Sequence, residues 1–439
     1  MQTSFSLAQL ADPQIAESEK ILRSCVHCGF CTATCPTYVL LGDENDSPRG
    51  RIYLIKDMLE NDRPATPEVV RHIDRCLSCL ACMTTCPSGV HYMHLIDHAR
   101  AHVEKTYERP PFDRLMRNFL RMVMPYPGRL RAALQASILA KPLAPLMERI
   151  GLTRLAAAVR LAPMRLPGHR LAKRVYPALG QHRGRVALLS GCANEALAPH
   201  IIQSTIRVLN RHGIEVTIPP DESCCGSLVH HMGHEHEAFD AARANIDAWT
   251  EEMEGEGLDA ILVTISGCGT TVKDYGFMLR SDPDYADKAA AVSAKARDVS
   301  EYLSQIPLQP SEAPPITLAY HSACSLQHGQ RVHREPQALL SRLGFQVRDV
   351  PEGHLCCGSA GTYNIMQPEI ASHLRARKVA NIESLHPHAI AAGNIGCITQ
   401  IASGTAIPIV HPVELVDWAT GGPRPAALAA LAETTVSVR

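Results

Sequence analysis

Residues 25–36 read CVHCGFCTATCP, and residues 76–87 read CLSCLACMTTCP. Both stretches have the spacing Cys-x2-Cys-x2-Cys-x3-Cys-Pro. In such a pair, three thiolates of one stretch surround a [4Fe–4S] cluster, and the fourth cysteine, next to proline, ligates the other cluster. The spacing therefore predicts two clusters with crossed ligation. The first set is Cys25, Cys28, Cys31 and Cys86, and the second set is Cys76, Cys79, Cys82 and Cys35.

Zinc is the alternative occupant of the same region, because two Cys-x2-Cys pairs can form a tetrahedral all-thiolate site. Such a site would use Cys25, Cys28, Cys76 and Cys79. It would leave four regularly spaced cysteines without a role, so the sequence favours iron–sulfur clusters. These four are Cys31, Cys35, Cys82 and Cys86.

The residues around the two motifs predict helices. The stretch SPRGRIYLIKDMLE (47–60) has apolar residues at mostly helical spacing, and Ser47 with Pro48 suits a helix start. PEVVRHID (67–74) begins in the same way. We therefore expect a mainly helical two-cluster ferredoxin domain over residues 1–104. Within it, Arg49 and Arg51 are either surface charges or partners of an anionic cluster, and both interpretations remain open.

A basic segment follows, and we expect residues 105–184 to form a helical connector. Residues 105–185 contain seventeen Lys or Arg and three Asp or Glu, a net charge of +14, so the rest of the chain carries −15. One interpretation is a basic face that docks on acidic surface of this chain or of a partner. The other is an interfacial element that meets anionic lipid.

The remaining eight cysteines form a repeat. Thirty-one residues separate Cys192 from the pair Cys224-Cys225, and thirty-one separate Cys324 from Cys356-Cys357. Glycine follows each pair, and each copy ends in one more cysteine. The repeat predicts a duplicated domain, with copies at residues 185–310 and 311–439. The further cysteines of the two copies are Cys268 and Cys397.

Short apolar runs such as RVALLSGC (185–192) alternate with helical patterns in both copies, which predicts parallel α/β layers. The cysteines follow the predicted strands at their carboxyl ends, where open α/β sheets bind ligands. The fold class is therefore α+β and multidomain, with the helical ferredoxin domain followed by two α/β cysteine-rich domains.

The two cysteine quartets are candidates either to share one further iron–sulfur cluster or to hold separate metals, an iron–sulfur cluster or zinc. Histidines accompany the quartets, although a lone histidine is more often an ordinary hydrogen-bonded residue than a ligand. Among them, His321 is the best candidate, because it stands three residues before Cys324 at a predicted strand end. The four histidines are His230, His231, His321 and His328.

Other function classes find little support. The net charge of −1 gives no indication of nucleic-acid binding. Nucleotide fingerprints, a P-loop and a serine–histidine triad are not evident, so we expect no catalytic residue and no FAD, NAD or ATP site in this chain. We find no apolar run of about 18 residues and no basic–apolar start, which predicts a cytoplasmic protein without a transmembrane helix.

Longer stretches carry a family resemblance over nearly the full length. They are ILRSCVHCGFCTATCPTYVLLGDENDSPRGRIYLIKDMLE (21–60), CLSCLACMTTCPSGVHY (76–92), YHSACSLQHGQ (320–330), CCGSAGTYNI (356–365) and HPVELVDWA (411–419). This pattern resembles the iron–sulfur subunits of glycolate oxidase (glycolate dehydrogenase). The resemblance implies a complex in which flavoprotein (FAD-binding) subunits oxidise glycolate to glyoxylate. This chain would pass the electrons to an acceptor such as quinone, either in the cytoplasm or peripherally on the inner face of the cytoplasmic membrane.

The duplicated half resembles the CCG domains of heterodisulfide reductase and of the lactate-utilisation and anaerobic glycerol-3-phosphate dehydrogenase subunits. Fuller members of that wider family end each motif in Cys-x2-Cys, whereas here Gly-Thr-Thr follows Cys268 and Ile-Thr-Gln follows Cys397. The alternatives are therefore a subunit for D-lactate or glycerol-3-phosphate oxidation, a disulfide-reducing CCG enzyme, and a structural or sensor module whose clusters only stabilise the fold.

Overall fold

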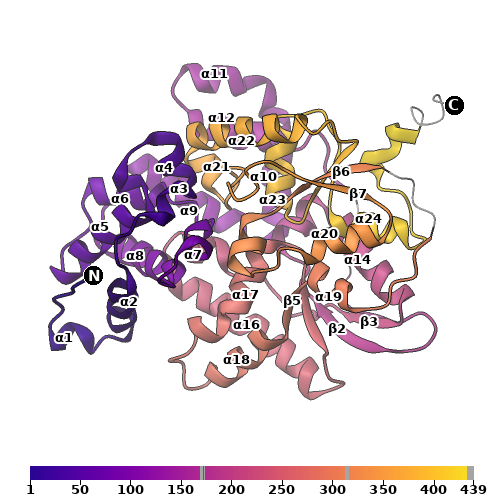
Figure 1. The fold of residues 1–439 in the computed structure, drawn as a ribbon, viewed down its shortest axis with the longest axis horizontal. Helices are drawn as coiled ribbons and strands as arrows, with labels where there is room; N and C mark the ends of the chain where they lie inside the picture. The colour runs from indigo at the N-terminus through magenta and orange to yellow at the C-terminus, as the bar shows by residue number, and fades with distance from the viewer. Residues whose placement is uncertain (169–171, 173, 312–315, 433–439) are drawn as a thin grey trace.

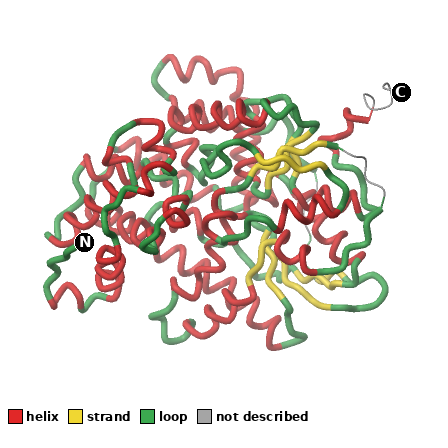
Figure 2. Tube along the Cα trace, viewed as in Figure 1, coloured by secondary structure: helices red, strands yellow, loops and turns green. Residues whose placement is uncertain are grey.

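The computed structural model describes residues 1–168, 172, 174–311 and 316–432. A helical N-terminal part lies at one side of the molecule, and two α/β modules lie at the other (Figure 1). Each module has its own small sheet, and the two sheets are separate groups of strands in Figure 2. A run of helices connects the N-terminal part to the modules.

The N-terminal part is helical, as the sequence predicts. Helix α5 begins at Pro48, and the Ser47 hydroxyl accepts a hydrogen bond from the Gly50 N–H. Helix α6 begins at Pro67 after the capping residue Thr66. Proline at the first helical position loses no hydrogen bond, and the capping hydroxyl satisfies a free N–H group. The helices are α1 (Leu7–Leu10), α2 (Pro13–Ser24), α3 (Phe30–Ala33), α4 (Pro36–Leu41), η1 (Glu44–Asp46), α5 (Pro48–Glu60), α6 (Pro67–Asp74), α7 (Ala81–Thr85) and α8 (Tyr92–Thr106).

The basic segment forms short helices broken by prolines. Part of its charge is paired within the chain, since Arg109 and Arg117 each lie 2.8 Å from Asp74, and Arg117 also lies 3.1 Å from Asp113. Among the described helices of the chain, none is both long and apolar enough to cross a bilayer. The helices are α9 (Pro111–Val123), α10 (Pro127–Ala140), η2 (Lys141–Leu143), α11 (Ala144–Arg149) and α12 (Thr153–Leu161).

The first α/β module has the strand order β1-β3-β2-β4-β5. All pairs are parallel except β1–β3. The strands are β1 (Val175–Tyr176), β2 (Gly184–Leu188), β3 (Ile214–Thr217), β4 (Ala260–Val263) and β5 (Ala296–Asp298). The helices are α13 (Cys192–Leu197), α14 (Pro199–Arg211), α15 (Ser227–His231), α16 (Glu235–Glu254), α17 (Ser266–Met278), α18 (Ala286–Lys295) and α19 (Val299–Gln305).

The second module repeats this order as β7-β6-β8-β9, with all pairs parallel. The order of β3-β2-β4-β5 is thus reproduced strand for strand, which confirms the predicted duplication. The strands are β6 (Thr317–His321), β7 (Gln346–Asp349), β8 (Ala389–Ala392) and β9 (Ile409–Val410). The helices are η3 (Ser325–Gly329), α20 (Glu335–Arg342), α21 (Tyr363–Met366), α22 (Pro368–Glu383), α23 (Ile395–Ala402), α24 (Pro412–Ala419) and η4 (Ala426–Ala432).

The two modules share one hydrophobic core. Leu188 and Leu209 of the first module belong to the same buried cluster as Leu318 and Leu340 of the second. Helix α14 of the first module packs on α24 of the second, and α19 of the first packs on α20 of the second. Two helices of each module therefore form the interface. Because their interiors are continuous, the modules hold each other in a defined orientation.

Each Cys-Cys-Gly turn requires its glycine. Gly226 and Gly358 have φ values of +79° and +88°, which only glycine adopts without strain. A Cβ atom at Gly358 would lie 2.6 Å from the carbonyl oxygen of Ala371, and one at Gly226 would lie 2.9 Å from that of Ala238. The glycines therefore let helices α22 and α16 lie directly against the cysteine pairs.

Candidate metal centres

The two N-terminal cysteine loops have the same unusual backbone. In the first loop His27 and Gly29 have positive φ values, and in the second loop Ser78 and Leu80 do so at the matching positions. A non-glycine residue in this region costs about 1–2 kcal/mol. Alternating left-handed residues turn successive N–H groups inward and form a concave site for anionic groups, including iron–sulfur clusters. The backbone therefore fits the clusters that the cysteine spacing predicts.

The first predicted cysteine set surrounds a hollow between the two loops. Cys25, Cys28 and Cys31 line it together with Cys86 of the second motif. A cysteine of the opposite stretch thus lies where crossed ligation would need it, and Cys82 of the second predicted set borders the same hollow. Arg49 also borders this hollow, and its guanidinium donates to the His27 carbonyl oxygen at 3.3 Å.

The second predicted set lies together in a more deeply buried place. Burial raises the pKa of Cys82, and the neighbouring Cys79, Cys76 and Cys35 raise it further. All four side chains are buried. Since iron binds thiolates and not thiols, cluster insertion would release these protons.

Arg51 is the buried positive charge beside the second set. It is 1% exposed, and its Nη1 atom lies 3.9 Å from the Cys35 sulfur. Burial opposes the charged form, but Cys76, Tyr92, Cys35 and Asp46 together raise the pKa of Arg51. Arg49, by contrast, is partly exposed and pairs with Glu44 at 2.7 Å. Of the two arginines, Arg51 is therefore the internal partner of the sulfur site.

The first quartet of the duplicated half also lies together. The sulfurs of Cys192 and Cys224 are 3.6 Å apart, and hydrogen bonds with Cys224 and Cys268 raise the pKa of Cys225. The Tyr275 hydroxyl donates to the Cys225 carbonyl oxygen at 2.9 Å. The sulfur site thus sits in a mainly apolar part of the first module.

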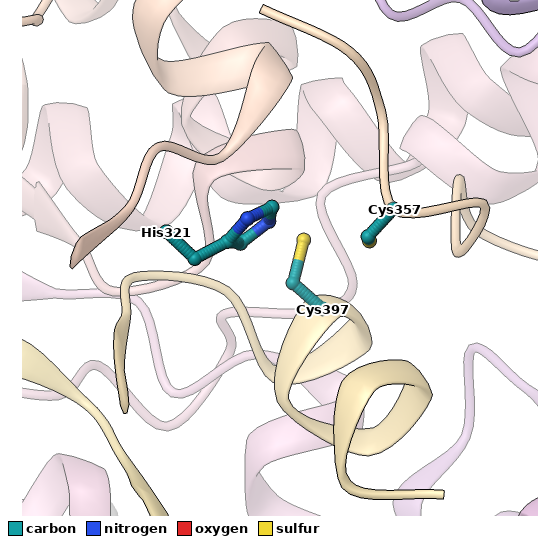
Figure 3. Close-up of side chains that lie close together, drawn as sticks. All are labelled: His321, Cys357 and Cys397. Atoms are coloured by element: carbon teal, nitrogen blue, oxygen red, sulfur yellow. The ribbon is translucent and has the colours of Figure 1, made fainter. Parts of the chain in front are cut away.

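The second quartet differs because a histidine joins it (Figure 3). The sulfurs of Cys324 and Cys356 are 3.7 Å apart. One ligand atom from each of His321, Cys357 and Cys397 lies within 4.8 Å of the other two. Burial lowers the pKa of His321 to about 3, which keeps the ring neutral and its lone pair available.

Both ring nitrogens of His321 lack a hydrogen-bond partner among the described residues, although the side chain is only 1% exposed. Leaving a buried polar atom unpaired costs about 1–3 kcal/mol. A metal bound to one nitrogen would remove part of that cost. The donor set therefore fits a metal or iron–sulfur centre at the second quartet.

Lys378 is a site residue that sequence reasoning missed. It is 2% exposed, and burial lowers its pKa while the thiols of Cys357, Cys356, Cys324 and Cys397 oppose that shift. Its Nζ atom donates to the Glu352 carbonyl oxygen at 2.9 Å. The sequence does contain a sign of this buried lysine, because Lys378 interrupts a stripe of apolar residues that recur every four positions along the helix. That stripe is Ile370, Leu374, Lys378 and Ile382.

The first copy lacks both basic side chains. Leu189 stands three residues before Cys192, where His321 stands before Cys324. Asn245 stands seven residues after Ala238, on which Gly226 packs, as Lys378 does after Ala371, on which Gly358 packs. Leu189 is buried and apolar, and Asn245 is buried, uncharged and donates to the Cys224 carbonyl oxygen at 3.1 Å. The two quartets therefore have different electrostatic surroundings although their folds match.

The other candidate histidines lie elsewhere. Among the described contacts, His328 bonds with the Thr84 hydroxyl at 2.7 Å and with the His354 carbonyl oxygen at 3.3 Å. His230 and His231 face Asp97, not a thiol. Of the four predicted histidines, His321 is the one that the structure places beside cysteines.

The second N-terminal set adjoins the second quartet. Cys79 and Cys356 belong to one buried cluster, against which Cys324 also packs. The Tyr363 hydroxyl donates to the Arg75 carbonyl oxygen at 3.0 Å and ties the two regions together. Three sulfur sites thus follow one another, from the Cys25 loop through the Cys76 loop to the second α/β module.

Comparisons with known proteins agree with the order of the domains. A family described as a 4Fe-4S dicluster domain matches residues 21–90, and one described as a cysteine-rich domain matches residues 186–273 and 318–402. The chain is 44% identical to the glycolate oxidase iron-sulfur subunit of Escherichia coli K12, over 95% of this chain and 99% of that protein. It is 30% identical to a probable glycolate oxidase iron-sulfur subunit of Bacillus subtilis 168, over 87% of this chain and 89% of that protein.

More distant similarity extends to other proteins. Lactate utilization protein A of Bacillus subtilis is 25% identical over 53% of this chain and 99% of its own length. Among solved structures, a hypothetical protein from Helicobacter pylori superposes with a TM-score of 0.55 at 11% identity, over 95% of this chain and 74% of that one. That likeness concerns the fold alone.

The charge of Arg51 provides a test of the second cysteine set. A nearby cation stabilises the more negative, reduced form of a cluster, so Arg51→Gln should lower the midpoint potential of that cluster by on the order of 50–100 mV. Redox titration followed by EPR measures the shift. Arg51→Lys, which keeps the charge, should shift the potential less. Arg49→Gln is the matched control, and an equal shift of the same cluster in that variant would contradict the assignment.

Proposed function

Because this chain belongs to the family of glycolate oxidase iron–sulfur subunits, we propose that it carries electrons within a flavoprotein complex that oxidises glycolate to glyoxylate. The chain is an electron-transfer subunit of an oxidoreductase, and it acts together with other subunits. The single observation that carries the proposal for this structure is the grouping of each predicted cysteine set around a loop whose backbone suits an anionic cluster.

The proposed ligands of the first [4Fe–4S] cluster are Cys25, Cys28, Cys31 and Cys86, and those of the second are Cys76, Cys79, Cys82 and Cys35. The clusters supply one-electron transfer. The chain itself excludes water from the second cysteine set and balances its charge through Arg51. Substrate oxidation needs no acid–base pair here, because we place the FAD and the substrate on partner subunits.

The second quartet is the proposed site of a further iron–sulfur centre or zinc ion. Its candidate ligands are Cys324, Cys356, Cys357, Cys397 and His321. Lys378 would offset the negative charge of such a centre, much as Arg51 does for the second cluster. Contact of this quartet with Cys79 supports a role in relaying electrons between the second cluster and the acceptor. The first quartet, Cys192, Cys224, Cys225 and Cys268, is the weaker candidate.

The proposed activity is tested on the complex purified without oxygen. Addition of glycolate should reduce both N-terminal clusters, as seen by EPR, whereas D-lactate and glycerol 3-phosphate should reduce them far more slowly. Cys86→Ser should remove the signal of the first cluster, and Cys35→Ser that of the second. Zinc in place of iron and sulfide would contradict the proposal. Clusters that no hydroxy acid reduces would favour a purely structural role.

The second quartet is tested by metal content. The double variant Cys356→Ser, Cys357→Ser should lose iron or zinc relative to the parent protein, while the EPR signals of both N-terminal clusters remain. The matched variant Cys224→Ser, Cys225→Ser reports on the first module. His321→Leu installs the residue type that the first copy carries, and it should alter the spectrum of the centre. Equal metal content in the parent and in Cys356→Ser, Cys357→Ser would contradict the site.

The helical segment offers a surface for anionic lipid. Apolar side chains are exposed at the end of α10, on α11 and in the loop after α12. Helix α11 lies at the top of the molecule in Figure 1. We call this surface the α11 patch; its apolar members are Leu139, Leu143, Leu146, Ile150 and Met164, which are 52–82% exposed.

Three cations accompany these side chains. Lys141 contacts the Met164 sulfur at 3.4 Å, and Arg149 and Arg165 are exposed nearby in the sequence. The acidic Glu148 in this region is paired with Arg160 at 2.9 Å. Exposed apolar residues among cations suit the interface of an anionic bilayer. We therefore propose that the α11 patch docks the complex peripherally on the inner face of the membrane, close to a quinone acceptor.

Vesicle binding tests this surface. The protein should sediment with vesicles rich in phosphatidylglycerol, less so at high salt, and not with phosphatidylcholine vesicles. Leu146→Asp with Ile150→Asp should weaken binding by at least about tenfold, because each side chain contributes roughly 1.5–3 kcal/mol when buried in apolar surroundings. Leu7→Asp, an equally drastic change at an 88% exposed position outside the patch, is the control. Equal loss in both variants would contradict the assignment.

A further inference from the structure

A group of metal-ligating side chains lies where the ferredoxin domain meets the first α/β module. Asp97 of α8 faces two consecutive histidines of α15. Its Oδ1 atom lies 3.3 Å from Nδ1 of His231, and its Oδ2 atom lies 3.9 Å from Nδ1 of His230. One ligand atom from each residue lies within 4.8 Å of the other two. This group is separate from all sixteen cysteines.

These separations suit a shared ion. Nitrogen and oxygen ligands bind zinc at about 2.0–2.2 Å, so two ligands of one ion stand roughly 3–3.5 Å apart. The Asp97–His231 separation falls in that interval. The Asp97–His230 separation of 3.9 Å is beyond hydrogen-bond distance, and it would have to shorten slightly to reach the interval. A simple ion pair accounts for one of the two histidines, whereas a bound ion accounts for both.

Space for further ligands is present. A cavity of about 200 Å³ adjoins the group and is lined by both Asp97 and His230. The cavity is also lined by the polar side chains of His94, His98, Glu235 and Asp274, which can hydrogen-bond to water. Two imidazoles and one carboxylate beside an open cavity form a ligand set typical of divalent transition metals with exchangeable positions.

The group is also connected to a cluster loop. Arg100 lies 3.5 Å from Asp97 and donates to the Ser78 hydroxyl at 2.6 Å and to the Cys76 carbonyl oxygen at 2.8 Å. Its guanidinium is thus held mainly by the loop of the second cysteine set. An ion on Asp97 would therefore join α15, α8 and this loop.

We propose that Asp97, His230 and His231 bind one divalent transition-metal ion, such as Zn²⁺ or Fe²⁺, which links the ferredoxin domain to the first α/β module. The ion takes three protein ligands and completes its coordination with water from the cavity. Imidazole ligands select such ions over Mg²⁺ and Ca²⁺, which prefer oxygen. The site is independent of the electron-transfer function, so either can fail without the other.

The probe is Zn²⁺ added to the full-length protein with its clusters in place, followed by gel filtration and metal analysis. The parent protein should retain about one zinc per chain more than the double variant His230→Gln, His231→Gln, with iron and sulfide equal in both. His236→Gln, an exposed histidine five residues further along, is the matched control and should retain the zinc. Equal zinc in the parent and in His230→Gln, His231→Gln would overturn the site.

X-ray absorption at the zinc edge, taken as the difference between the parent protein and His230→Gln, His231→Gln, separates this site from any zinc on the second quartet. Nitrogen and oxygen neighbours at about 2.0–2.2 Å, without sulfur, are expected in that difference. A difference that contains only a sulfur shell at about 2.3 Å would place the lost zinc on cysteines and would overturn the proposal. Failure of the parent protein to retain any zinc or iron beyond its clusters would do the same.

Discussion

Negative charge buried on sulfur is the constraint on which this structure depends. Thiolates that share a cluster cannot be buried without compensation of their charge. Part of this compensation comes from backbone N–H groups that turn inward in the two loops at His27–Gly29 and Ser78–Leu80. It adds buried basic side chains at Arg51 and Lys378. Each lies beside a cysteine group and donates to a backbone carbonyl oxygen.

The duplication gives one fold two electrostatic environments. Both modules have the same order of parallel strands and the same glycine at the cysteine pair. Only the second has a histidine and a lysine at its quartet, and only the second shares a described core cluster with Cys79. The uncharged residues Leu189 and Asn245 occupy the matching places in the first module. A duplicated scaffold has thus kept its geometry in both copies, while the charge near its sulfurs differs.

Sequence reasoning reached the features that are encoded locally. Cysteine spacing predicted which residues would gather, and the Ser47–Pro48 signal placed the start of α5. Strands β2 and β6 were visible as apolar runs before cysteines, whereas β1 and β5 were missed because they contain two and three residues with no apolar pattern. The grouping of Asp97 with His231 joins positions 134 residues apart, which no local pattern records. The role of Lys378 was detectable as a break in an apolar stripe.

The packing of helices between the two modules has a consequence for biosynthesis. Helix α14 is made early but packs on α24, which is made some two hundred residues later, so the first module cannot complete its interior on the ribosome until the second is almost finished. The loop around Cys79 is covered by residues such as Tyr363 and Leu374 only at that late stage. The cell's cluster-loading machinery would therefore have a window, during translation, in which the deepest sulfur ligands are still accessible.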